Sequence, residues 1–494
     1  MPSSYPQAAT HGVERFSSRG ANAGSNGATR RQFLGGAAAV AAGSFLSGIS
    51  LAQNPPVCPA APTGGKPFTP GSDKRPIVLR RAISALSSSQ LAELQSAFTK
   101  LRALPSTDKR TWVLQADIHS LFCDQCNGVT MQIHGSWNFF PWHRAYLYYY
   151  ERILGSLVGD INNFRLPYWD WENSRSMPSP YLSPGNSGNP LWDANRDALI
   201  AAGGALPSSD GTKARIATLF GITDFATFGG TAIAGGACET DPHDIIHGDV
   251  GPPSPPFEDM GNLGYAARDP IFFGHHCNID NLWSGWNAQP GTGTSYKNPT
   301  DPGFLNASWS FYDENQKVVS ITAADVLNYE SNLRYTYQAP RLTVTIPLYE
   351  ILVCELVCCI PGPDPGPYLQ VSQDVSELIL AQVRENIPVV LVLSGVEIPE
   401  GVTGAFDVVA VRGESHTQIG SLTVLADSMR AKTRKRVTLV LDISKAAPDL
   451  LAHEKPASIN LFARHPAENA AKPFILRAQK AQIRTQKRDQ KQRN

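Results

Sequence analysis

The sequence is short of charge for its length. Asp, Glu, Lys and Arg make up only 17% of its 494 residues, against about 25% in an average soluble domain. Its 43 basic and 43 acidic side chains cancel, and the two ends carry a basic surplus. Residues 1–52 hold four arginines against one glutamate, and residues 471–494 hold eight basic side chains against one aspartate. The acidic balance of the chain between them argues against a nucleic-acid-binding core.

Long hydrophobic runs are also missing. The longest apolar stretch, from Gly35 to about Leu51, is too short and too rich in glycine for a membrane span. It follows Arg30 and Arg31 and ends in the small residues around Ala52, which is the layout of a twin-arginine export signal. We therefore expect residues 1–52 to be a signal, and the mature protein to be soluble and periplasmic or secreted. A thylakoid lumen is the alternative, and a chance arginine pair is the competing interpretation.

Several metal and redox signatures are absent. The sequence has no H-E-x-x-H and no H-x-E…C-x-x-C pattern, so the usual catalytic zinc motifs are excluded. Cys123-x-x-Cys126 has no second CxxC with which to complete a four-thiolate zinc site. The eight cysteines permit disulfides in an exported protein but do not establish them.

The pattern along the chain predicts two folded parts. Residues 53–340 alternate helical patterns with long loops, and one helix is expected to begin near Ser87–Ser89, before apolar residues at helical spacing. A proline- and glycine-rich stretch at 361–367 lies inside a linker, residues 341–370. Short β-rich runs then fill residues 371–470 and favour a sandwich or a barrel. They are 388–393, 406–411, 422–425, 437–443 and 459–462. Residues 471–494 are expected to form a solvated basic tail.

Histidines gather in two clusters within the helical part. The first is His119, His134 and His143, and the second is His243, His247, His275 and His276. Three helix starts are expected next to them, with Pro141 as a first helical residue and with Asp241-Pro242 and Asp269-Pro270 as cap-plus-proline pairs. His243 and His247 are four residues apart, so both imidazoles project from one face of a helix and can bind one ion. Imidazole suits copper, zinc, iron and nickel, and two all-histidine groups favour a copper pair.

The residues around these histidines resemble a known family. Gln115–His119 and Gln132-Ile-His-Gly-Ser-Trp-Asn-Phe-Phe-Pro-Trp-His-Arg144 resemble the first copper region of tyrosinases and polyphenol oxidases, and Glu239–His247 and Asp269–Asp280 resemble the second. The resemblance extends from about Arg80 to Tyr337 and is strongest to the plant-type branch, which includes bacterial members. Phe311–Asn315, Tyr335–Tyr337 and Ala405–Val408 also match family signatures.

This resemblance implies a mainly α catalytic domain, an antiparallel four-helix bundle around a dinuclear copper centre, followed by an all-β sandwich. The first copper ion would be bound by His119, His134 and His143, and the second by His243, His247 and His276. His275 would support the second group without binding metal, although the reverse assignment of His275 and His276 stays open. Cys123 would form a thioether with His134, with Cys126 as the rival partner.

The resemblance also implies oxidation of small phenols by O2. Catechols would become o-quinones, and monophenols would be hydroxylated next to their oxygen. Glu239 would hold a water near the site. Asp244 stands where hydroxylating members often have asparagine, so catechol oxidation alone stays open as a second function. Leu263 stands where plant-type enzymes often have a phenylalanine gate, so we expect a wider entrance. Asp280 is expected to orient nearby donors or to form a simple helix salt bridge.

The β-rich part resembles the shield that covers the metal site of latent polyphenol oxidases until it is cleaved, here within the exposed stretch 361–367. The cluster of Cys354, Cys358 and Cys359 is expected to be a disulfide or buried thiols rather than a copper carrier. The family's usual upstream disulfides cannot be complete, because Ser120 replaces one cysteine and only Cys58 lies upstream. A haemocyanin-like O2 carrier and a copper-storage protein are the competing functions. The natural phenol and the oligomeric state are left open.

Overall fold

The computed structural model describes most of the chain after its N-terminal segment. It covers residues 59–125, 133–182, 188–338, 349–353, 368–369, 373–398, 402–425, 435–451, 457–464 and 474–486. Residues Pro55–Asn494 belong to one compact unit. Several expectations concern residues outside the described ranges: the export signal of residues 1–52, Cys58, Cys126, the stretch 361–367, and Cys354, Cys358 and Cys359.

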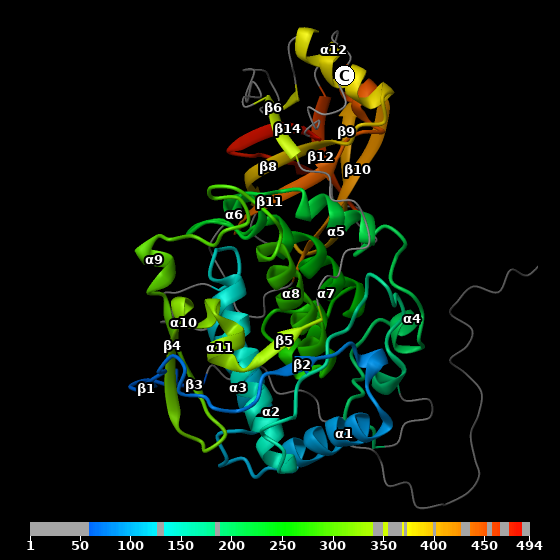
Figure 1. Cartoon of the computed structure of the whole chain (residues 1–494). Helices are drawn as coiled ribbons and strands as arrows, with labels where there is room; N and C mark the ends of the chain where they lie inside the picture. Colours follow the sequence, from blue (N-terminus) through cyan, green and yellow to red (C-terminus); the bar gives the residue numbers. More distant parts are fainter. Residues whose placement is uncertain are drawn as a thin grey trace, which may run out of the picture. The chain divides into compact units, whose positions relative to one another are not determined.

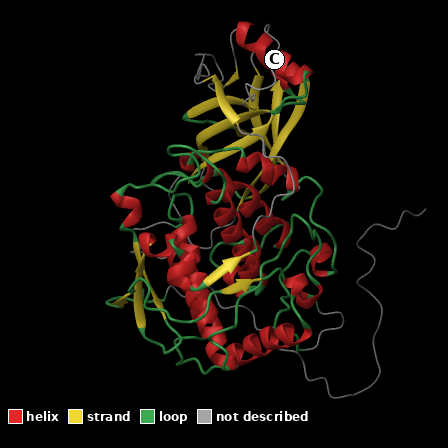
Figure 2. Cartoon of the chain, viewed as in Figure 1, coloured by secondary structure: helices red, strands yellow, loops and turns green. Residues whose placement is uncertain are grey.

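The part of the chain before residue 340 is mainly helical, with long loops between helices (Figure 1 and Figure 2). Its longer helices are α1 (Ser88–Arg102), α2 (Trp112–Ser120), α3 (Phe139–Val158), α5 (Lys213–Phe220) and α8 (Ile271–Asn287). Its shorter helices are α4 (Ala198–Ala201), α6 (Phe225–Phe228), α7 (Ile245–Val250), α9 (Pro302–Leu305), α10 (Ala323–Leu327) and α11 (Tyr329–Leu333). Two small sheets join distant segments: β1 (Lys66–Pro67), β4 (Val318–Thr322) and β3 (Ser308–Tyr312) in one, and β2 (Val78–Arg80) with β5 (Tyr335–Tyr337) in the other.

Local chemistry sets the ends of the main helices. At the start of α1 the Ser87 side chain accepts from the Gln90 N–H, and the Gln90 side chain accepts from the Ser87 N–H, which is a capping box. Helix α3 ends at Gly159, whose φ of 80° is a left-handed conformation that glycine adopts without a Cβ clash. Before α8, the Asp269 carboxylate accepts from the Ile271 N–H at 3.0 Å. The expected start of α1 is confirmed, whereas α8 begins one residue later than expected, at Ile271 with Pro270 as its N-cap.

Two other expected helix starts also differ in the structure. Helix α3 begins at Phe139, so Pro141 lies inside its first turn instead of opening it. Asp241 does not cap a helix: it is extended, with φ −153° and ψ 111°, within a π-helical turn that precedes α7. Its carboxylate instead pairs with Arg215, 2.6 Å away, because that cation offers a stronger partner than a neutral N–H.

The C-terminal part is an antiparallel β-sandwich, as expected. One sheet has the order β10 (Ser415–Val424), β9 (Gly404–Arg412), β12 (Ala457–Ala463) and β13 (Phe474–Ile475), with β7 (Tyr368–Leu369) also on β12. The other has the order β11 (Lys435–Asp442), β8 (Val389–Ile398), β14 (Lys480–Gln486) and β6 (Tyr349–Val353). Helices α12 (Gln373–Arg384) and α13 (Ala447–Leu450) accompany these sheets. Each of the five expected β runs overlaps one of the strands β8 to β12.

Strand β8 is buried on both faces. Val389, Leu391 and Leu393 pack inside the sandwich. Val390 and Val392, on the opposite face, belong instead to the hydrophobic core formed by the helical part. Because both faces are covered, the strand is a continuous apolar run rather than an alternating one. The same sheet thus closes the sandwich and attaches it to the helices.

The expected linker and tail both contribute strands. Within residues 341–370, β6 pairs with β14 and β7 pairs with β12. Within residues 471–494, β14 is hydrogen-bonded to both β8 and β6, so the expectation of a solvated tail is wrong for Lys480–Gln486. The number of basic residues suggested a solvated segment. Arg484, however, is only 5% exposed, because it is paired with Asp224.

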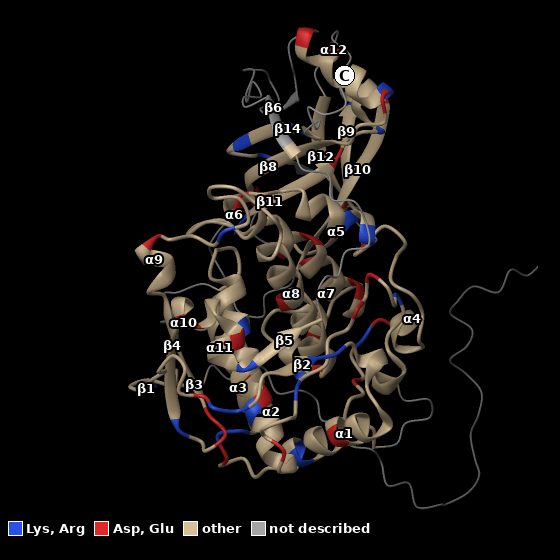
Figure 3. Ribbon diagram, in the orientation of Figure 1, with Lys and Arg blue, Asp and Glu red and all other residues tan. Residues whose placement is uncertain are grey.

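Charged residues are scattered along the described chain, and uncharged residues dominate the ribbon (Figure 3). Among the described helices, none combines the length and the hydropathy needed to cross a bilayer.

Candidate metal centre

The two histidine clusters come together in the core of the helical part. His119 lies in α2, His143 in α3, His247 in α7, and His275 and His276 in α8. His134 lies just before α3, and His243 lies in the π-helical turn before α7. Four helices and two short connections thus bring seven imidazoles together.

The first group is made by His119, His134 and His143. The His119 and His143 Nε2 atoms are 3.4 Å apart. The His134 ring centroid is 5.3 Å from that of His119 and 5.1 Å from that of His143. The three rings therefore surround a common point.

The second group is made by His243, His247 and His276. The His276 Nε2 lies 3.3 Å from the His243 Nε2 and 3.2 Å from the His247 Nε2. The two groups face each other, since the His143 and His276 rings are stacked with centroids 4.2 Å apart.

Hydrogen bonds on the outer side of the rings fix their direction. The Nδ1 of His143 donates to the Phe139 carbonyl at 2.7 Å, and the Nδ1 of His247 donates to the Met260 carbonyl at 3.0 Å. The Nδ1 of His243 lies 2.9 Å from a carboxylate oxygen of Asp244. Because these acceptors hold the proton on Nδ1, each Nε2 keeps its lone pair and turns it inward.

The donor set fits a pair of metal ions. Burial lowers the pKa of all six histidines, so each ring is neutral and able to bind metal. Lone pairs that converge at 3.2–3.4 Å repel one another unless a cation lies between them. Both ring nitrogens of His134 are buried with no hydrogen-bond partner among the described residues, which is costly unless one binds a metal.

His275 lies close to the second group but is held differently. Its Nδ1 accepts the indole N–H of Trp171 at 3.2 Å, and burial keeps the ring neutral, so its proton lies on Nε2 and neither nitrogen has a lone pair to offer. Distance alone does not separate the two neighbours, because ligand atoms of His243, His247, His275 and His276 all lie within 4.8 Å of one another. The Trp171 contact favours His276 as the ligand.

Cys123 lies beside the first group. Its Sγ is 3.4 Å from the His119 Nδ1 and donates to the His119 carbonyl at 2.9 Å. Ligand atoms of His119, Cys123 and His134 lie within 4.8 Å of one another, so the sulfur is near the ring with which the thioether is expected. The bond itself stays a prediction.

Glu239, Asp244 and Leu263 line a cavity of 30 Å³ beside His134. One Glu239 oxygen accepts from the Gly135 N–H at 2.6 Å, and the other is buried without a hydrogen-bond partner among the described residues. Burial raises the pKa of Glu239 well above its usual value, and the nearby Asp244 raises it further. Burial also raises the pKa of Asp244 to about 8, against the opposing charge of Lys435.

Residues of the β-sandwich complete the lining of this cavity. They are Ile398, Leu422, Thr423, Val424, Leu425, Lys435 and Val437. A space of 30 Å³ holds about two waters and no aromatic ring. Sequence reasoning missed Lys435, because nothing in its neighbours along the chain marks a lysine that lies opposite Glu239 and Asp244.

Asp280 connects α3 and α8, two of the helices that carry the histidines. Its carboxylate accepts from the Arg144 Nε at 2.6 Å and from the Tyr335 and Tyr337 hydroxyls at 2.6 and 2.7 Å. It also pairs with Arg80 at 3.3 Å. Arg144 follows His143 in α3, and Asp280 follows His276 by one turn in α8. Asp280 therefore orients donors from three other segments, which goes beyond a salt bridge within one helix.

Two facing groups of neutral imidazoles, held by a helical bundle and covered by a β-sandwich, define a protein with a buried dinuclear metal site. An all-histidine donor set fits copper, which accepts imidazole readily and needs no carboxylate ligand.

Comparisons with known proteins agree with this description. The common central domain of tyrosinase matches residues 109–220 and 196–289, and the polyphenol oxidase middle domain matches residues 298–345. The latent form of a chloroplastic polyphenol oxidase from Prunus armeniaca is 36% identical over an alignment 323 residues long, which covers 58% of this chain and 52% of that protein. The matched region spans about half the length of the curated relatives.

Solved structures show the same architecture. Polyphenol oxidase from Grenache (Vitis vinifera) is 33% identical and matches 58% of this chain and 93% of its own, with a TM-score of 0.53. Recombinant latent aurone synthase is 26% identical and matches 84% of this chain and 92% of its own, with a TM-score of 0.61. The chain belongs to the tyrosinase and polyphenol oxidase family, in its plant-type branch.

Proposed function

We propose that this protein is a copper-dependent phenol oxidase that uses O2 as its second substrate. It oxidises catechols to o-quinones and hydroxylates monophenols next to their oxygen. The single observation that carries the proposal is the pair of facing imidazole groups whose inner nitrogens converge at 3.2–3.4 Å. Two catechols supply the four electrons and four protons that reduce one O2 to two waters.

The histidines hold the metal ions in this proposal. His119, His134 and His143 bind one copper ion, and His243, His247 and His276 bind the other, with His275 held aside by Trp171. Bound there, the copper pair supplies O2 activation and the transfer of electrons from the phenol. The outer carbonyl and carboxylate partners would keep the rings oriented toward the bound ions.

Glu239 and Asp244 handle the proton of the phenol. The cavity that they line has room for a water, and one Glu239 oxygen has no partner among the described residues. A water between this oxygen and the substrate hydroxyl carries the proton to the carboxyl pair. This relay serves the monophenol, whose oxygen must lose its proton before the ring is attacked.

The β-sandwich keeps the enzyme latent. Thr423, Val424 and Lys435 line the small cavity beside His134, and in this proposal they block the approach of a phenol to the metal site. Cleavage within residues 361–367 releases this cover. Leu263 then borders the entrance and leaves more space than an aromatic gate.

Export and covalent maturation complete the proposal. Residues 1–52 direct export by the twin-arginine route, which carries folded proteins. The thioether between Cys123 and His134 locks that ring before export, in line with their ligand atoms lying within 4.8 Å of each other.

Oxygen uptake tests the function. Copper-loaded protein is given a monophenol and then the matching catechol, before and after protease treatment. We expect uptake with both substrates after cleavage and little before it. The control is His276→Ala protein, which keeps the shield but lacks one ligand.

Each result that contradicts the proposal points to a particular alternative. Uptake with catechol alone makes the protein a catechol oxidase and points to Asp244 as the first residue to change. Reversible O2 binding without sustained uptake makes it a carrier, and the absence of any O2-dependent absorption makes it a copper-storage protein. Equal activity before and after cleavage contradicts the covering role of the sandwich.

A further inference from the structure

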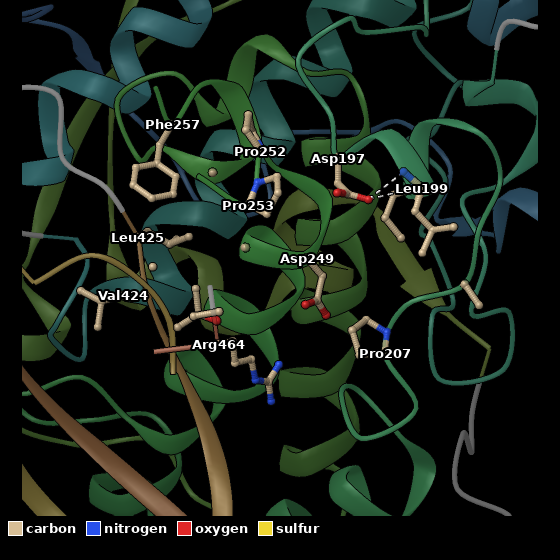
Figure 4. A pocket seen from close by; sticks show the side chains of 17 residues that line it. Asp197, Leu199, Pro207, Asp249, Pro252, Pro253, Phe257, Val424, Leu425 and Arg464 are labelled. Carbon is tan, nitrogen blue, oxygen red and sulfur yellow. Dashed lines mark hydrogen bonds between the residues drawn. The ribbon is translucent and has the colours of Figure 1, made fainter. Parts of the chain in front are cut away.

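A second, larger cavity lies where the helical part meets the β-sandwich. Its volume is 480 Å³, within the range of small-molecule pockets. Pro252, Pro253 and Phe257 line it from the helical part, and Val424 and Leu425 line it from the sandwich (Figure 4). The walls are therefore mostly apolar and come from both parts.

The charged groups in this cavity are few, and they differ in whether they already have hydrogen-bond or ion-pair partners. The Asp197 carboxylate caps α4 by accepting from the Leu199 N–H at 2.9 Å (Figure 4). The Arg464 guanidinium is bound by two carboxylates, Asp210 at 3.2 Å and Asp407 at 2.8 Å. Asp249 differs, because its Oδ2 is buried and has no hydrogen-bond partner among the described residues.

This arrangement selects the chemistry of a ligand. An anion gains little here, because Arg464 already faces two carboxylates and Asp249 adds a third acidic group. A neutral molecule with a hydroxyl donor gives the Asp249 Oδ2 the partner that it lacks. Apolar walls with one phenylalanine and two prolines suit an aromatic ring. We propose that the cavity binds a neutral aromatic molecule that carries a hydroxyl group.

Because of the position of the cavity, a ligand bound there would affect how the sandwich covers the metal centre. Thr423, Val424 and Leu425 line both this cavity and the small cavity beside His134. A ligand that contacts both walls binds the covered arrangement better than one in which the sandwich has moved away. By linkage, it holds the sandwich over the metal centre. At ten times its Kd, such a ligand shifts the equilibrium by about elevenfold toward the covered form.

Equilibrium dialysis of the full-length, copper-loaded protein tests the binding. The probe is 4-propylbenzyl alcohol, which has the ring and the hydroxyl but is not a phenol. We expect one saturable site. Ala205→Phe, which fills the cavity from an exposed position, weakens binding at least tenfold, whereas Ala92→Phe, an equally exposed change on α1, leaves Kd unchanged. No saturable binding, or equal Kd values in the two variants, overturns the proposal.

The role of Asp249 is tested separately, by comparing the Kd values of two ligands rather than by filling the cavity with a larger side chain. The methyl ether of the probe lacks the donor, so we expect it to bind at least tenfold more weakly than the alcohol. In Asp249→Asn protein this preference falls below threefold. Equal binding of alcohol and ether to the unaltered protein overturns the hydrogen-bond assignment.

The coupling is measured without turnover, by the rate at which a chelator removes copper from the covered protein. We expect the probe at ten times its Kd to slow removal about tenfold in the unaltered protein, and the same concentration to slow it by at most about twofold in Ala205→Phe protein. An unchanged rate in the unaltered protein overturns the coupling. Failure of the proposed oxidase activity would leave the dialysis result intact, so the two ideas are tested separately.

Discussion

Replacing Asp280 with asparagine is expected to cost a large share of the protein's stability. The carboxylate balances two buried guanidinium groups, since the Arg80 and Arg144 side chains are 0% and 1% exposed. Glu151 pairs with Arg80 but not with Arg144, so the change leaves Arg144 without a charged partner. Breaking one side of a buried ion pair costs about 3–5 kcal/mol. The asparagine amide also replaces one acceptor oxygen by an NH2 donor, which then faces either the Arg144 Nε or the Tyr335 and Tyr337 hydroxyls and adds to the loss.

The assay is urea unfolding of the copper-free protein at pH 7, followed by tryptophan fluorescence, with refolding to establish reversibility. Glu397→Gln is the matched control, because its pair with Arg436 is about one-third exposed, at 29% and 34%. We expect the control to lose at most about 1 kcal/mol. An equally small loss in Asp280→Asn would refute the view that this carboxylate neutralises the core.

The same variant has a defined pH dependence. Burial by itself raises the pKa of Asp280, but Arg144 and then Arg80 outweigh it, and the net pKa is lowered. A group whose pKa is lowered on folding stabilises the protein above its ordinary pKa, and that stabilisation is lost as the pH falls through the folded value. The difference between the two proteins should therefore stay constant from pH 7 to about pH 5 and shrink below about pH 4. A difference that grows on acidification contradicts this assignment.

Three further predictions concern the metal centre. His276→Gln should lower the bound copper from two ions to about one per chain, whereas His275→Gln should retain both, as measured by elemental analysis; the opposite result reverses the ligand assignment. Leu263→Phe should lower kcat/KM for bulky phenols by roughly tenfold relative to unsubstituted phenol in the activated enzyme, and an unchanged substrate profile contradicts a gating role. A peptide containing Cys123 should be linked to His134 in the mature protein and be lighter by two hydrogen atoms, and Cys123→Ala should abolish the link; an unlinked peptide in active, copper-loaded protein refutes the thioether.

The sequence alone located the chemistry, because the relevant signals are local. The i, i+4 spacing of His243 and His247 and the cap at Ser87 act within one or two helical turns, so neighbouring residues suffice to predict them. The continuous apolar run at Val389–Leu393 also predicted a strand, because a strand that is covered on both faces has apolar residues at every position. Pro141 and Asp241 show the limit of such signals. Each obeys a helix-start preference, yet α3 begins two residues before Pro141, and Asp241 pairs with Arg215 instead of capping a helix.

The tertiary structure decided which distant residues meet. Lys435 lies beside Glu239 and Asp244 because a strand almost 200 residues further along the chain packs over the metal site. Arg484 looked like part of a solvated tail, but pairing of β14 between β8 and β6 buries it against Asp224. Local preferences specify helices, turns and donor spacing. Burial, ion pairing and the closing of cavities depend on contacts between segments far apart in the chain, and a sequence pattern carries no record of those until the chain is folded.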